Sequence, residues 1–206
     1  MGRAEDNKRD KRERIMAAGR HLFSRHGYAG TTMDDVARHA GVSKGALYFH
    51  TGSKAGLVNQ LFEADFTAWI EQAFTEPDDR SDRGLLDRLV AVYARLLQLM
   101  CDAPDLTRVF MAEAGAGAEV DEVRSAMHNL LGRTVDLLEW AKHEGELVPE
   151  VNSRRLAYNL WALYFVEQHR WLLQPPGSAP PDPITTIEAR LRPRFTTQLD
   201  GYLVGR

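Results

Sequence analysis

Hydrophobic residues recur along this chain at the three- and four-residue steps of an amphipathic helix. Three stretches show the pattern clearly: Ile15, Ala18, Leu22 and Phe23; Leu57, Leu61, Phe62, Phe66 and Trp69; and Leu85, Leu89, Val92, Leu96 and Leu99. No stretch sustains the alternation of a β-strand between turn signals. Glycines and prolines separate the helical stretches, and the longest break is the proline-rich segment 174–183. The sequence therefore predicts an all-α fold.

Residues 31–57 carry the clearest local signals for helix ends. Thr32 is a good N-cap, and Asp35 can complete a capping box, so a helix is expected from Met33 to Ala40, ended by Gly41. Ser43 can cap a second helix over about 44–50, with Leu47 packed against Val36. Ser53 and Lys54 would begin a third helix. This segment has the outline of a helix-turn-helix.

In a helix-turn-helix the second helix lies in the DNA major groove. The outward positions of that helix would be Lys44, Gly45, Ala46, Tyr48, Phe49 and His50. Glycine and alanine permit close approach, Lys44 and Tyr48 can reach phosphates, and Ala46 or Phe49 can touch a thymine methyl. Lys54 would add a cation at the start of the next helix, where backbone N–H groups favour a phosphate. These residues indicate DNA binding.

The charge is unevenly distributed, although the formal net charge is only -3. Residues 1–60 carry a net +5 and the remainder a net −8. A basic head on an acidic body is typical of a polyanion-binding module attached to a second domain. The basic run 8–14 fits two interpretations equally well, a solvated helix face or a flexible arm toward the DNA backbone or minor groove.

Other classes of protein find little support in the sequence. The 44% hydrophobic fraction is ordinary, and no apolar run approaches the roughly 18 residues of a membrane span. The polar start lacks a secretory signal, and the single Cys101 fits a reducing compartment, so a cytoplasmic protein without membrane contact is expected. We find no phosphate loop, nucleophile elbow or metal-ligand spacing. An enzyme, a cofactor and a metal site are therefore not expected.

The segment "GYAGTTMDDVARHAGVSKGALYFHTGSKAGL" resembles the DNA-binding segment of the TetR family of bacterial transcriptional repressors. The resemblance covers roughly Ile15 to Leu61. The Gly-Tyr, Thr-Thr, Ala-Gly-Val-Ser, Leu-Tyr-x-His and Ser-Lys elements appear in the family's order and spacing. Two positions depart from the family pattern: Thr51 stands where a phenylalanine is usual, which removes an apolar contact under the second helix, and Ala55 stands where an acidic residue is usual.

The resemblance implies two domains and a set of DNA contacts. The expected domains are a three-helix helix-turn-helix domain, residues 1–55, and a helical-bundle domain for effector binding and dimerisation, residues 56–206. The DNA-facing residues carried over by position are Thr32, Met33, Ser43, Lys44, Gly45, Ala46, Tyr48, Phe49, His50 and Lys54.

The body of the chain is rich in aromatic and methionine side chains that could line an effector pocket. The candidates are Phe62, Phe66, Trp69, Tyr93, Leu97, Met100, Phe110, Met111, Met127, Leu130 and Tyr158. For each of them singly, a filled helical core is the competing interpretation. An unknown effector of apolar or aromatic character is favoured, although the acidic body could also pair with a cation.

A helix expected over 153–173 is apolar on more than one face and so must bury more than one face. One face can meet the body's own core, and we expect the other to meet a second subunit. The predicted interface residues are Trp161, Tyr164, Trp171 and Leu172, with Phe195 and Leu199 from the last helical segment. Pro193 is expected to kink that segment or split it into two helices.

Together these patterns predict a homodimeric, ligand-responsive transcriptional regulator. Its partners would be a double-stranded, palindromic DNA operator and a small-molecule effector that releases it. Repression is favoured over activation. A helix-turn-helix DNA binder without a ligand is the alternative.

Overall fold

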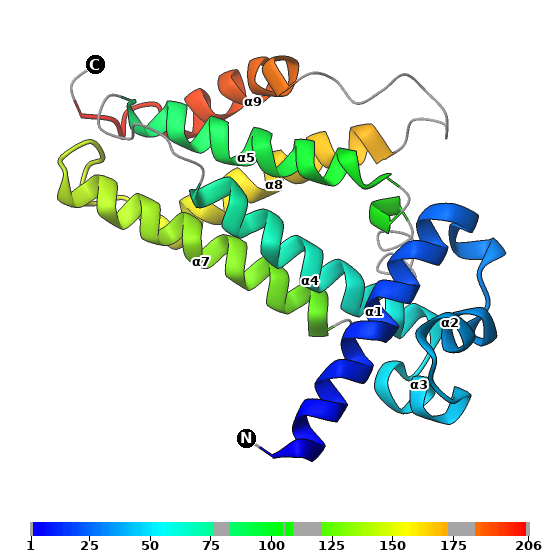
Figure 1. Ribbon diagram of the computed structural model, residues 1–206. Helices are drawn as coiled ribbons and strands as arrows, with labels where there is room; N and C mark the ends of the chain where they lie inside the picture. The colour runs from blue at the N-terminus through cyan, green and yellow to red at the C-terminus, as the bar shows by residue number, and fades with distance from the viewer. Residues whose placement is uncertain (1, 76–82, 105, 109–120, 173–183, 205–206) are drawn as a thin grey trace. The chain divides into compact units, whose positions relative to one another are not determined.

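The computed structural model describes residues 2–75, 83–104, 106–108, 121–172 and 184–204. Its helices are α1 (Arg3–Gly30), α2 (Met33–Ala40), α3 (Lys44–Thr51), α4 (Lys54–Thr75), α5 (Leu85–Asp102), α7 (Asp121–His143), α8 (Ser153–Leu172) and α9 (Ile184–Leu199) (Figure 1). In these ranges the only β pairing is an isolated bridge between Leu147 and Leu203. The predicted all-α fold is confirmed.

The chain divides into two compact units. The first comprises residues 1–66 and 103–125, and the second comprises residues 67–102 and 126–206. Helix α4 begins in the first unit and ends in the second, without a break between Lys54 and Thr75. The domain boundary expected at residue 55 falls at the second residue of this helix.

The first unit packs α1, α2, α3 and the first part of α4 around one apolar core. Ile15, Val36, Leu47, Leu57 and Leu61 are all at most 1% exposed. Each lies on the inward face of its helix, at the spacing that the sequence predicts. Helix α1 crosses α4 closely, since a Cβ added at Gly19 would lie 3.1 Å from side-chain atoms of Leu57 and Leu61.

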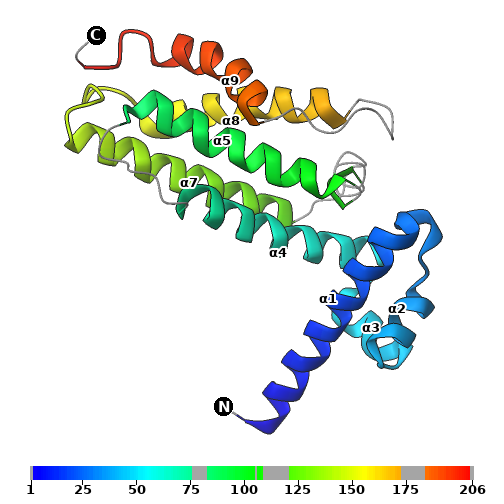
Figure 2. The ribbon, with the colours of Figure 1, turned by 45° about the horizontal axis from the view of Figure 1, so that its top comes forward.

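The second unit is a helical bundle in which α5 and α8 both pack against α9 (Figures 1 and 2). Three buried rings stand at its centre: Tyr93 lies 5.3 Å from both Tyr164 and Phe195, measured between ring centroids. The Tyr93 hydroxyl lies 3.0 Å from that of Thr134, and the Tyr164 hydroxyl donates to the Met100 sulfur at 2.9 Å. Burial raises the pKa of both tyrosine hydroxyls, so both stay neutral donors.

The turn after α7 is tied to the start of α5 and to the C-terminal tail. The Glu146 carboxylate accepts from the Leu85 backbone N–H at 2.8 Å and pairs with the buried Arg88 guanidinium. Backbone hydrogen bonds from Val148 to Tyr202 and from Val204 to Glu146 hold the tail against this turn. Glu146 therefore links the turn after α7 to the first turn of α5.

Helix α9 runs as one helix through Pro193, so of the two outcomes expected at this proline, a kink or a split, the split does not occur. The guanidinium of Arg194 donates to the Arg190 carbonyl at 2.7 Å, in the helical turn that contains the proline. Pro193 is itself exposed, so water can reach the backbone that its ring leaves without a helical bond. The proline-rich segment 174–183 lies outside the described residues. Within the described helices, none is long and apolar enough to cross a membrane.

Candidate nucleic-acid interface

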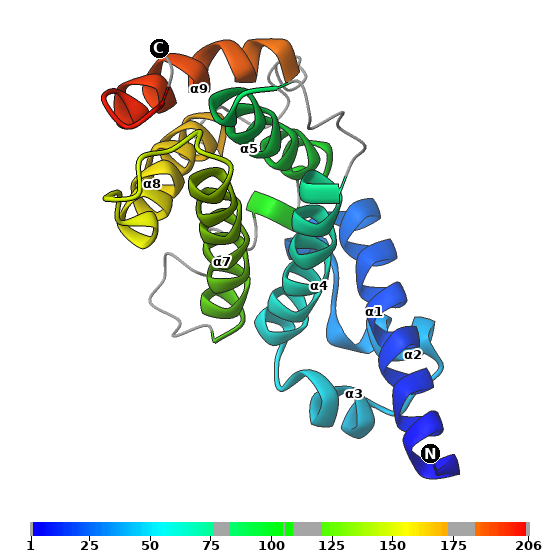
Figure 3. The same ribbon diagram turned by 90° about the vertical axis from the view of Figure 1, so that its left-hand side faces the viewer.

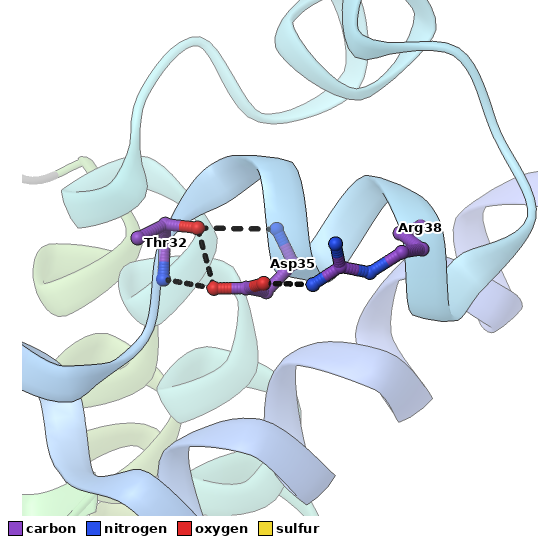
Figure 4. A network of polar contacts seen from close by, with 3 residues as sticks. All are labelled: Thr32, Asp35 and Arg38. Carbon is purple, nitrogen blue, oxygen red and sulfur yellow. Dashed lines mark hydrogen bonds and ion pairs between the residues drawn. The ribbon is translucent and has the colours of Figure 1, made fainter.

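Helix α2 begins at a complete capping box, as its sequence predicts. The Thr32 hydroxyl accepts from the Asp35 backbone N–H at 3.2 Å and donates to the Asp35 carboxylate at 2.5 Å. That carboxylate also accepts from the Thr32 backbone N–H and pairs with the Arg38 guanidinium (Figure 4). The Thr32 side chain, its backbone N–H and Arg38 all favour the ionised form, so the pKa of Asp35 is lowered. The start of α2 is therefore fixed by local contacts.

The end of α2 is held by a residue from α1. Gly41 adopts a left-handed conformation, φ 64° and ψ 38°, which suits glycine and turns the chain toward α3. Arg14 donates to the carbonyl of Ala40 at 3.1 Å. Arg14 thus caps α2, a structural role that its place in the basic run 8–14 did not reveal.

Two further contacts stabilise the first unit, one at the end of α1 and one between α1 and α4, and sequence reasoning missed both. The buried Thr31 hydroxyl lies 2.9 Å from the Gly27 carbonyl and 3.1 Å from that of Leu22. Arg20 on α1 forms a two-point ion pair with Asp65 on α4. In the Thr-Thr pair, Thr31 therefore locks the end of α1 while Thr32 starts α2. The capping box of Thr32 has a sequence signature, whereas the hydrogen bond from Thr31 to the Gly27 carbonyl has none, although its partner is similarly close in the chain.

Helix α3 presents one face to solvent. Leu47 and Thr51 are buried, whereas Tyr48 is 41% exposed and Phe49 is 78% exposed. Lys44 and Gly45 are also exposed, and the side chains of Ala46 and His50 are partly exposed. The Ser43 hydroxyl accepts from the Ala46 N–H at 3.2 Å and caps the helix as predicted. The outward positions predicted from the sequence are those that the structure leaves accessible.

Lys44 is engaged by a neighbouring acid in the free protein. Its ammonium lies 2.7 Å from the Asp34 carboxylate, and this hydrogen bond and ion pair raise the pKa of Lys44. Both side chains are more than half exposed, so solvent screens the pair. A phosphate must compete with Asp34 for this ammonium.

The turn between α3 and α4 depends on a close backbone approach. A Cβ at Gly56 would lie 2.1 Å from the Thr51 carbonyl oxygen, so only glycine fits there. The buried Thr51 hydroxyl donates to the Leu47 carbonyl at 3.0 Å, and Gln60 donates to the His50 carbonyl. Thr51 thus satisfies its own polar group under α3, where the family pattern has an apolar ring.

Lys54 begins α4, and its ammonium lies 4.1 Å from the centroid of the Tyr28 ring. The ring face holds the cation by a cation–π contact while its N–H groups stay able to donate. The Ser53 hydroxyl caps the helix by accepting from the Gly56 N–H at 2.9 Å. Tyr28 of the Gly-Tyr element therefore orients Lys54.

Met33 is the exception among the predicted DNA-facing residues. Its side chain is 7% exposed and packs in the core of the first unit, because the first turn of α2 points that side inward. Only its backbone remains available at the helix start.

Comparison with known proteins identifies this arrangement. Residues 15–61 match the sequence profile of the bacterial regulatory proteins of the tetR family. The chain belongs to the TetR family of bacterial transcriptional regulators. It is similar to the transcriptional regulator TtgR of Pseudomonas putida, 26% identical over 84% of this chain and 85% of that protein. RutR of Escherichia coli O157:H7 is 28% identical over 74% of this chain and 71% of RutR.

Solved TetR-family structures share the fold. A TetR-family regulator from Mesorhizobium loti MAFF303099 superposes with a TM-score of 0.69 at 19% identity, over 99% of this chain and all of that one. FadR of Thermus thermophilus, solved with lauroyl-CoA, superposes with a TM-score of 0.70 at 22% identity, over 95% and 96% of the two chains. An N-terminal helix-turn-helix and a helical C-terminal domain are therefore the architecture of this TetR-family chain.

The predicted effector residues are scattered across this TetR-family fold. Phe62 and Phe66 stack within the first unit, 5.3 Å apart, while Tyr93, Leu97, Met100 and Leu130 are buried in the second. Trp69 and Met127 are partly exposed, and Phe110 and Met111 lie outside the described residues. Tyr158 is 54% exposed, so it does not line an internal pocket of the protomer.

The second unit contains a small internal cavity beside Cys101. Leu97, Cys101, Glu167, Arg170, Trp171, Ile187 and Arg190 line it. Its volume is about 20 Å³, which is the space of a single water. This cavity is too small to be a preformed effector site.

Half of the predicted dimer interface lies inside the protomer. Tyr164, Phe195 and Leu199 are at most 1% exposed and form the core between α5, α8 and α9. Their periodicity correctly predicts that they are buried. They are covered by helices of the same protomer, however, and not by a second subunit. Trp161, Trp171 and Leu172 are partly exposed and remain available to a partner.

Proposed function

We propose that this TetR-family regulator is a homodimeric repressor that binds a palindromic operator and is released by a small-molecule effector. The observation that carries the DNA-binding part is the exposed face of α3. Phe49 is 78% exposed beside Tyr48 on a helix whose other face is fully buried. Large exposed aromatic side chains on a rigid, capped helix are costly unless a partner covers them. DNA is the partner that the fold supports.

In this proposal α3 enters the major groove and its flanks hold the backbone. Gly45, Ala46 and Phe49 approach base edges, while Lys44, Tyr48 and His50 reach the groove edge or phosphates. Thr32 and Ser43, at the starts of α2 and α3, lie at helix N-termini that attract phosphate. Lys54 adds a further phosphate contact, oriented by Tyr28.

The outer face of α8 supports dimerisation. Tyr158 and Val166 are 54% and 55% exposed, and the rings of Trp161 and Phe165 lie between them. Successive rings are in contact, with centroids 5.4 Å apart for Tyr158 and Trp161 and 5.2 Å for Trp161 and Phe165. We assign this stripe, together with Trp171 and Leu172, to the dimer interface in place of the buried Tyr164, Phe195 and Leu199.

An effector response is supported by family membership and by the continuity of α4. FadR of Thermus thermophilus, one structural neighbour, is a repressor solved with lauroyl-CoA. In this chain α4 begins at Lys54 and continues into the second unit, so a shift of its far end can move the DNA-binding unit. We propose an apolar or aromatic effector for this chain. By linkage, the operator must weaken effector binding by the factor with which the effector weakens operator binding.

Selection from a randomised duplex pool tests the proposal. The purified full-length protein is expected to retain a palindrome whose half-site centres lie roughly 34–36 Å apart. Tyr48→Ala should lose the selected sequence while remaining a dimer by analytical ultracentrifugation. Retention of no common sequence by the wild type at moderate salt would refute sequence-specific binding.

A further inference from the structure

The N-terminal part of α1 forms one wall of a cleft beside the recognition helix. We call residues 3–14 of α1 the arm; they precede the segment that matches the family profile. The cleft has a volume of about 230 Å³ and is lined by Glu5, Lys8, Arg9, Arg12 and His50. Figures 1 and 3 show the arm running beside α3. The cleft therefore lies between the basic arm and the end of α3, the helix proposed to read the bases.

The arm residues in this cleft form a single stripe along α1. Glu5, Lys8, Arg9 and Arg12 follow the i, i+3, i+4, i+7 spacing of one helix face. The structure therefore makes the arm a helix over this stretch, rather than a flexible tail. Its side chains project from one face of this helix.

Three described cations of the arm, Lys8, Lys11 and Arg12, take part in no ion pair with a neighbouring acid. Arg9 lies 3.9 Å from Asp6 and 3.7 Å from Glu13, and Arg14 lies 3.1 Å from Asp10. Among the residues that the structure describes, no carboxylate lies within 4 Å of the Lys8 or Arg12 side-chain nitrogens. Two of these unpaired cations, Lys8 and Arg12, line the cleft.

We propose that this cleft is a second DNA-binding site, which seats a backbone phosphate next to the bases read by α3. Lys8 and Arg12 contribute cationic donors from one side, and His50 contributes a ring N–H from the other. The inference rests on the proposed function, because it needs α3 in the major groove. It adds an element outside the helix-turn-helix that sets affinity without reading sequence.

The Glu5 carboxylate allows a test of the site by a gain in DNA affinity. Its carboxylate lines the same cleft and accepts from the Gly2 N–H at 3.3 Å, at the start of α1. A phosphate seated there is repelled by this carboxylate. The neutral variant Glu5→Gln keeps an acceptor for Gly2 and removes the repulsion. A purely structural role for the arm gives no reason for a gain in DNA affinity on this substitution.

The test measures operator affinity of the full-length protein between 50 and 200 mM salt, on the duplex that the wild type selects. The double variant Lys8→Gln/Arg12→Gln should lower the slope of log K against log salt by roughly 2 for the dimer, about 0.9 for the one phosphate lost from each of its two clefts. Its preference for the palindrome over a scrambled duplex should stay unchanged. Glu5→Gln should bind both duplexes more tightly.

Arg25→Gln is the matched control, because Arg25 is an exposed arginine of the same helix, outside the cleft. Glutamine is a good helix former, so circular dichroism should show equal helix content in all variants. A double variant that changes the slope no more than Arg25→Gln would overturn the site. So would weaker binding by Glu5→Gln. Either result leaves the proposed function intact, whereas a wild type that selects no operator contradicts that function instead.

Discussion

At the scale of single residues, the sequence predicts contacts whose partners lie three or four positions away. Thr32, Asp35 and Ser43 cap the helices that their spacing indicates. The contacts of Arg14 with Ala40 and of Arg20 with Asp65 could not be predicted, because each joins residues far apart in the chain. An arginine on a charged helix gives no signal of which distant partner it will meet.

Lys44 provides a residue-scale prediction. In the free protein Asp34 holds its ammonium at 2.7 Å, and DNA binding must break this pair and bring a phosphate near the carboxylate. Asp34→Asn should therefore tighten binding to operator and scrambled duplexes alike. Fluorescence anisotropy at fixed salt measures both affinities. Asp200→Asn, an exposed aspartate in the second unit, is the control. Unchanged or weaker binding by Asp34→Asn would argue against a phosphate contact by Lys44.

At the scale of elements, periodicity predicts helices and burial but not the surface that covers a buried face. Tyr164, Phe195 and Leu199 are buried as expected, yet α5, α8 and α9 bury them within the protomer. Met33 is likewise an inward residue of α2. Pro193 shows the converse limit, since its helix continues where the local rule allows either a kink or a break. The sequence of one helix predicts which of its faces is buried, whereas the element that covers that face depends on how all the helices pack together.

The start of α2 gives an element-scale prediction. Thr32→Val keeps the side-chain shape and removes the cap, so the free energy of unfolding should fall by about 1 kcal/mol at pH 7. Urea denaturation at one protein concentration measures this. The control variant is Thr197→Val on α9. It removes a hydroxyl that donates to a helix carbonyl, and no carboxylate takes part in that hydrogen bond.

The same cap should depend on pH. The pKa of Asp35 lies below its ordinary value of 3.8 in the folded state, so its ionised form stabilises folding. That stability is fully present above the ordinary value and is lost as the pH falls through the lower folded pKa. The wild type should therefore lose more stability on acidification than Thr32→Val does. Equal losses would show that the Thr32 hydroxyl does not hold this carboxylate.

At the scale of the whole molecule, the sequence predicts the architecture well. The signals of the helix-turn-helix are local and lie within residues 15–61, and hydrophobic periodicity predicts the helices of the rest. The effector site is not defined by composition, since aromatic and methionine side chains fill a core as readily as they line a pocket. Tyr93 and Met100 are core residues that bond to Thr134 and Tyr164. Tyr158 lies on the opposite, exposed face of the bundle's α8.

The exposed stripe of α8 gives a prediction for assembly. Val166→Glu places a carboxylate in the proposed interface and should weaken dimerisation by about 3 kcal/mol or more, because the charge is buried without a partner. Val204→Glu is a close control, as Val204 is 54% exposed against 55% for Val166. Sedimentation should find a monomer for the first variant and a dimer for the second. A dimer in both would remove α8 from the interface.

The central claim is that two copies of α3, held at a fixed separation, read two half-sites at once. The most direct test inserts five base pairs between the half-sites of the selected operator, which turns one half-site to the opposite face of the duplex. The account predicts that the affinity of the wild-type protein falls by at least about 100-fold, toward its affinity for scrambled DNA. Equal affinity for the two spacings would mean that each subunit binds alone, and would contradict the dimeric repressor.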